Sequence, residues 1–162
     1  MPKHLSDSSV QSAAELFCLS LVGTELQVRL EPEEIRLEDG TQFRIDGMDQ
    51  QAKVLCEFFA HVGSMKDGQK KKLAKDMLKL LAIEHALGGA WRKIICVVDE
   101  PARSFLCGKS WCSAVVREFH FEVVVVSVTA DLLSGVQQAQ LLQAEGMRQR
   151  PSTKIRARSS NG

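Results

Sequence analysis

Two apolar runs in the second half of the chain limit the fold most strongly. Residues 93–98 (KIICVV) form an almost uninterrupted apolar run, which is typical of a strand buried on both faces of a sheet. Residues 121–128 include four consecutive valines and predict a second strand. A helix is predicted between them, from about Ser110 to Phe119. Strands that alternate with helices pair in parallel through right-handed crossovers, so we expect an α/β fold.

The first half of the chain predicts a helix, three strands of the antiparallel type and a long second helix. Asp39-Gly40 is expected to form a tight turn, because this pair readily takes positive φ angles. Gly23 and Gly88 are expected to end helices. Asp99, Glu100 and Pro101 are expected to break the strand at 93–98. The elements are then a helix from Ser8 or Ser9 to about Leu21, a strand or extended lead-in at 24–30 that Pro32 interrupts, a hairpin of 35–37 and 41–45, a strand at 54–62, a helix from about Gln69 to Leu87, and a last helix at about 132–147.

This order of elements is an αβββαβ core with a mixed central sheet flanked by helices, followed by an αβα extension. The length of 162 residues fits a single domain, which we assign to residues 1–147. No run is long enough to span a bilayer and no signal-peptide pattern is found, so we expect a cytoplasmic protein. The five cysteines lie mostly in apolar runs, which favours buried reduced thiols over disulfides. Cys107 and Cys112 lack the partners that would complete a zinc site.

Glu57 is the most informative polar residue, because it lies within an apolar strand. Strand alternation places Leu55, Glu57, Phe59 and His61 on one face. A carboxylate in such surroundings has to be paired, protonated, bound to a metal or at an edge of the sheet. Asp46, which follows the preceding strand 11 positions earlier, is the acid expected nearest to it.

The long helix carries a polar border beside its apolar arc. Gln69, Lys72, Asp76 and Lys79 fall within about 80° of one another, from where their side chains can bend toward Glu57. The alternative is an amphipathic helix with a lysine-rich solvent face, which is the simpler interpretation of the run that begins at Lys70.

The order of elements, the pair Asp46 and Glu57, and the polar-bordered helix resemble the PD-(D/E)xK nuclease superfamily, which has the restriction-endonuclease fold. More narrowly, EFFAHVGSMKDGQKKKLAKDMLKL and GKSW followed by a helix and FHFEVVVV are similar to a small branch of that superfamily, over residues 35–147. The resemblance implies that Asp46 and Glu57 bind Mg²⁺ (or Mn²⁺) and that Glu15 assists beside the metal. Magnesium prefers one or two carboxylates and keeps several waters, which agrees with these residue types.

One position departs from the motif of the superfamily. The lysine expected two residues after Glu57 is Phe59, which can neither orient water nor neutralise phosphate. Either its role has moved to Lys72 and Gln69 of the helix, or hydrolysis has been lost. Accessory roles then fall to His61 and Asp76, and Asp49 is a second candidate for the first acid.

The end of the chain is basic and has no acid. Residues 148–162 are expected to form a disordered tail, which either contacts phosphate backbones together with Lys70 or only solubilises the chain. Its basic residues are Arg148, Arg150, Lys154, Arg156 and Arg158.

The resemblance implies a metal-dependent nuclease that hydrolyses phosphodiester bonds of DNA. A homodimer is possible, and no membrane is involved. Two alternatives remain open. In the first, the chain is a catalytically inactive module of the same fold that binds nucleic acid or a protein. In the second, it is a structural α/β domain in which Glu57 and Lys72 form an internal ion pair.

Overall fold

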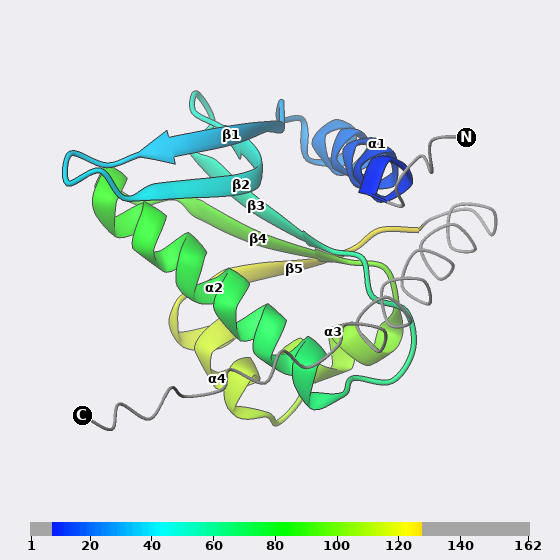
Figure 1. Cartoon of the computed structure of the whole chain (residues 1–162). Helices are drawn as coiled ribbons and strands as arrows, with labels where there is room; N and C mark the ends of the chain where they lie inside the picture. The colour runs from blue at the N-terminus through cyan, green and yellow to red at the C-terminus, as the bar shows by residue number, and fades with distance from the viewer. Residues whose placement is uncertain (1–7, 128–162) are drawn as a thin grey trace, which may run out of the picture.

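The computed structural model describes residues 8–127, with side chains from Glu15 onward (Figure 1). Nine helices and strands follow one another in this part of the chain in the order αβββαβααβ. They are α1 (Ser8–Leu26), β1 (Glu31–Arg36), β2 (Gln42–Asp49), β3 (Val54–Phe59), α2 (Asp67–Leu87), β4 (Arg92–Val97), α3 (Glu100–Cys107), α4 (Trp111–Glu118) and β5 (Phe121–Val125).

The five strands form one mixed sheet in the order β1-β2-β3-β4-β5. β1, β2 and β3 are joined by antiparallel pairing, whereas β3, β4 and β5 run parallel. The predicted α/β class, the antiparallel first half and the parallel second half are therefore confirmed. The predicted last helix at 132–147 and the tail at 148–162 lie outside the described residues. Among residues 8–127, no helix is both long and apolar enough to cross a membrane.

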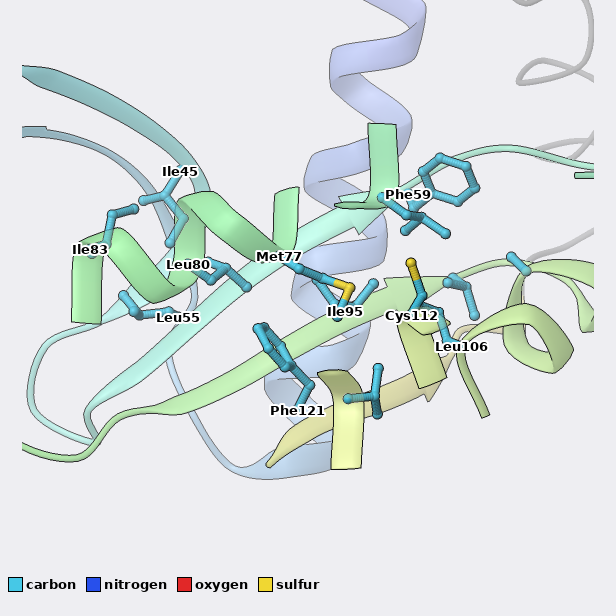
Figure 2. Packing of buried hydrophobic residues seen from close by; sticks show 14 of the residues in the cluster. Ile45, Leu55, Phe59, Met77, Leu80, Ile83, Ile95, Leu106, Cys112 and Phe121 are labelled. Atoms are coloured by element: carbon cyan, nitrogen blue, oxygen red, sulfur yellow. The ribbon is translucent and has the colours of Figure 1, made fainter. Parts of the chain in front are cut away.

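Helices cover the sheet on both faces. Buried side chains of α1 pack on one face, against alternate residues of β3 and β4 such as Phe58 and Ile94. On the other face, α2, α3 and α4 pack over Leu55, Phe59 and Ile95 (Figure 2). β3 is buried along its whole length, so the predicted alternation of its side chains divides them between two apolar cores. This position in the middle of the molecule is what makes a carboxylate at Glu57 costly.

The hairpin of β1 and β2 turns at Asp39-Gly40, as predicted. Gly40 has a φ of +86°, and the Leu37 amide donates to the Thr41 carbonyl at 2.8 Å. The Asp39 carboxylate accepts a further bond from the Thr41 amide at 2.8 Å. Pro32 lies within the edge strand β1, where a residue without an amide hydrogen costs no ladder bond.

One expected helix end, at Gly23, and one expected strand were wrong. α1 runs through Gly23 to Leu26, so residues 24–26 are helical and no strand forms at 24–30. Gly23 serves another purpose: its carbonyl accepts from the Val28 amide at 2.9 Å, and a Cβ there would lie 2.7 Å from the Val28 carbonyl oxygen. Glycine is needed because the chain folds back closely over the helix.

Residues 99–101 start a helix as well as ending a strand, which the sequence analysis missed. Asp99 is the N-cap of α3, with its carboxylate accepting from the Ala102 amide at 3.4 Å. Pro101 lies in the first turn, where proline is tolerated because the amides there have no helical partner. Ser110 caps α4 by accepting from the Ser113 amide at 3.1 Å, which confirms the start predicted for that helix.

All five cysteines are free thiols, as expected, and only Cys107 is exposed. Burial raises the pKa of the Cys18 thiol to about 11, and Cys56 and Cys96 lie with their Sγ atoms 3.4 Å apart in the core.

Because the thiolate is the reactive form, we expect one fast-reacting thiol per native chain in a titration with a chromogenic disulfide, and five after denaturation. Cys107→Ser removes the fast thiol. Any fast-reacting thiol that remains in that variant would contradict the burial of the other four cysteines.

Candidate acidic site between strands β2 and β3

Asp46 and Glu57 lie where the pairing of β2 and β3 ends. The ladder between these strands covers Gly47 to Asp49 of β2 and stops before Asp46. Beyond that point the carboxylates replace the ladder bonds. The Phe58 amide donates to Asp46 Oδ2 at 2.9 Å, and the Asp46 amide points to Glu57 Oε1 at 3.4 Å. The structure therefore brings together the two acids that the sequence analysis paired.

The cation next to Glu57 is Lys79. Its Nζ lies 2.7 Å from Glu57 Oε1 and donates to the Arg44 carbonyl at 3.0 Å. Lys72, the lysine that we expected here, instead pairs with Asp76 at 2.9 Å and lies over the Phe59 ring at 5.3 Å. The internal pair anticipated between Glu57 and Lys72 is therefore formed with Lys79, two helical turns further along the same face.

The environment of Glu57 disfavours its charged form. Glu57 is 2% exposed, and this burial raises the pKa of its carboxyl group to about 7. The negative charge of Asp46 adds to the rise, and Lys79 opposes it through a hydrogen bond and its charge. Asp76 raises the pKa slightly further, which places a third carboxylate within electrostatic reach. The ammonium of Lys79 thus offsets only part of the cost of ionising Glu57.

Other predicted residues of the helix and loop lie around this group but contact it less directly. Asp76 is buried against Lys72. Gln69 has a buried Oε1 with no hydrogen-bond partner in the described part of the chain. His61 is turned toward the loop, where its Nε2 lies 3.1 Å from the Ser64 carbonyl and its ring lies 5.7 Å from that of Phe59.

Two further acids have different surroundings. Glu15 of α1 and Asp46 together line a hollow of the surface, whose remaining wall includes Arg44 and Pro32. This hollow gives Asp46 a route to solvent on the side of α1. Asp49 instead holds a turn: it accepts from the Ala52 amide at 2.9 Å and the Arg29 amide at 2.8 Å, and these bonds hold its pKa below the ordinary value. Asp49 is at the far end of the β2–β3 ladder, opposite Val54.

Of the residues that we expected to contact nucleic acid, Lys70 is the one within residues 8–127. Lys70 is half-buried, with its Nζ 5.8 Å from the centre of the Phe105 ring. The basic residues of the tail lie beyond the described residues.

The donors available to a metal are carboxylate oxygens. Within residues 8–127 no group of three His, Cys, Asp or Glu side chains is arranged to hold a metal ion. Asp46 and Glu57 supply the one or two carboxylates that Mg²⁺ takes when waters complete its shell, so the residue types fit a hydrated magnesium ion.

Lys79 is the residue whose importance the sequence analysis underestimated. The periodicity of the helix placed it in the polar border with Gln69, Lys72 and Asp76, but the motif directed attention to the first turns.

Comparison with family models, with curated proteins and with solved structures finds no match.

Proposed function

We propose that this chain is a metal-dependent nuclease that hydrolyses phosphodiester bonds of DNA, with a restriction-endonuclease-like fold. The observation that carries the proposal is the grouping of two carboxylates and a lysine, Asp46, Glu57 and Lys79, at the point where β2 and β3 part. The αβββαβ order and the mixed sheet support it, because they are the arrangement expected of the superfamily that the sequence resembles.

Asp46 and Glu57 are the metal ligands in this proposal. A bound magnesium ion lowers the pKa of its water and neutralises charge on the scissile phosphate. The residue types fit such an ion, and burial followed by the negative charge of Asp46 raises the pKa of Glu57 by more than Lys79 offsets. The hollow beside Glu15 gives access to Asp46, and Glu15 is the second carboxylate that lines it.

Lys79 takes over the positive charge that the missing motif lysine would provide. Phe59 occupies the position of that lysine and is part of the apolar core. Lys79 approaches the same carboxylate from α2, so the charge is supplied by the helix rather than by the strand. Lys72, which lies over the Phe59 ring and pairs with Asp76, is the second cation of this surface.

The proposal is tested by titrating Mg²⁺ and Mn²⁺ calorimetrically into the wild type, Glu57→Gln and Asp46→Asn, followed by cleavage assays on single- and double-stranded DNA. We expect cation binding and cleavage in the wild type and the loss of both in the two variants. Asp49→Asn is the matched control, because Asp49 is a carboxylate of the same strand that holds a turn. Full metal-dependent cleavage by Glu57→Gln would refute the proposal.

The second candidate is a module of the same fold that binds DNA without cutting it. It is favoured by the close pairing of Glu57 with Lys79, which leaves that carboxylate 3% exposed, and by Phe59 in place of the motif lysine. Salt-dependent DNA binding by a wild type that neither binds cations nor cleaves would support this candidate.

A further inference from the structure

The two edges of the sheet are built differently. β1, at one edge, carries Pro32, a break in register between Glu31 and Glu33, and exposed glutamates. Proline, irregular register and charge are the devices by which proteins prevent an edge strand from pairing with another chain. β1 is therefore a protected edge.

β5, at the other edge, has no proline and no break in register, and its one charged residue is paired within the sheet. It lies beside β4 (Figure 1), pairs with it in unbroken register and reads Phe-Glu-Val-Val-Val. Val125 is 39% exposed. No strand within residues 8–127 lies on its outer side. An apolar edge strand with free backbone groups is a template for pairing with another strand.

The hydrogen bonds to β4 show which backbone groups of β5 face outward. The Val126 amide donates to the Val97 carbonyl at 2.8 Å, and Val97 is in register with Val125. In a parallel ladder, alternate residues turn their amide and carbonyl groups to opposite sides. The groups of Phe121, Val123 and Val125 therefore point away from β4.

The single charge of β5 is already neutralised. Both carboxylate oxygens of Glu122 accept bonds from Arg92 of β4, each at 2.8 Å. Glu122 thus faces its neighbour within the sheet and does not protect the edge as an unpaired charge would.

We propose that β5 pairs antiparallel with β5 of a second copy of this chain, so that two five-stranded sheets join across a two-fold axis. With Val123 opposite its own counterpart, Phe121 faces Val125 of the second copy, and the outward groups of both strands exchange hydrogen bonds. Glu122 then faces Val124 of the second copy, so like charges are not opposed. A second copy fits this edge better than residues 131–147, because that stretch is rich in Leu, Gln and Ala, which favour helices over strands.

The interface is separate from the acidic site, because β4 lies between β5 and β3. The proposal therefore does not depend on the proposed function. It is tested on the full chain by light scattering coupled to size exclusion over a range of concentrations. We expect the mass to rise from 17.9 kDa to twice that value as the concentration increases. A wild type that stays at 17.9 kDa throughout would overturn the proposal.

Val125→Pro removes an outward amide without removing a bond to β4, so we expect a folded monomer. Val125→Thr is the matched control, because it keeps both the amide and the β-branched shape, and it should dimerise like the wild type. Circular dichroism checks folding, and Val125→Lys, which adds a charge to the edge, is the second test if the proline variant is unfolded. A dimer that survives in folded Val125→Pro and in Val125→Lys would contradict the proposal.

Hydrogen exchange distinguishes a second copy from the chain's own residues. The Val123 and Val125 amides should become protected only as the dimer forms. Protection that is already complete in the monomer would mean that residues 128–162 cover the edge, and this result would also overturn the proposal.

Discussion

Lys79→Met is expected to lower the free energy of unfolding by about 3 kcal/mol at pH 8, because it leaves the carboxylate of Glu57 buried without a cation. The methionine retains most of the aliphatic length of lysine, so packing changes little. Lys75→Met, an exposed position of the same helix, should change stability by a few tenths of a kcal/mol. Chemical denaturation of both variants, in the presence of a chelator, measures the difference.

The effect of Lys79→Met should depend on pH in a direction that Glu57 determines. The pKa of Glu57 is about 7 in the folded protein and 4.5 for an ordinary glutamate, so ionisation costs stability as the pH rises from 4.5 through 7. Lys79 lowers this pKa, and without it the cost at high pH is larger. The variant should therefore approach the wild type as the pH falls below the folded value of about 7.

Glu57→Gln combined with Lys79→Met should recover most of the lost stability, because no unpaired charge remains. A loss that is the same at pH 4 and pH 8, or that the double variant does not recover, would mean that Lys79 acts by packing alone.

Lys72 was the expected partner of Glu57, whereas Lys79 is the observed one. This difference shows what the periodicity of a helix does not predict. Residues seven apart on a helix differ by about 20° in direction and by about 10 Å along the axis. The pattern of apolar residues fixes which face of α2 meets the sheet, so it correctly placed both lysines at the border. Which one meets Glu57 depends on the position of α2 along β3, and this position is set by packing between residues far apart in the sequence.

The sheet itself was predictable because its signals are local. The apolar run in β4, the valines of β5 and the turn at Asp39-Gly40 each specify their own conformation. Gly23 was misread because its role depends on Val28 returning over α1, which is a tertiary contact. α3 was missed because Asp99 and Pro101 are as typical of a helix start as of a loop.

The proximity of Asp46 and Glu57 was expected from their neighbouring strands, but the hydrogen bonds that hold their side chains were not. Sequence indicated two acids side by side. It gave no sign that the ladder stops at Gly47 and that each carboxylate then takes the place of a backbone partner. This exchange of bonds ties each carboxylate to the backbone of the neighbouring strand.

Glu84→Gln is expected to cost about 3 kcal/mol, because it removes the partner of a lysine that lies inside the apolar layer. The Lys93 side chain is 7% exposed, and its Nζ lies 2.7 Å from Glu84. Although partial burial favours the neutral form of Glu84, bonds from Lys93 and from the Trp91 amide hold its pKa below the ordinary 4.5. Glu31→Gln is the control, since the Arg29–Glu31 pair has the same 2.7 Å separation but is exposed, and its loss should cost less than about 1 kcal/mol.

The pH dependence separates this pair from the one at Glu57. The lowered pKa of Glu84 means that its contribution is present above pH 4.5 and is lost as the pH falls through the folded value, so Glu84→Gln should show nearly its full cost between pH 5 and 7. Lys79→Met should show little of its cost at the lower end of that range, where Glu57 is protonated. Lys93→Met added to Glu84→Gln should restore stability by removing the unpaired cation. If Glu84→Gln and Glu31→Gln cost the same, burial is not what makes the Lys93–Glu84 pair strong.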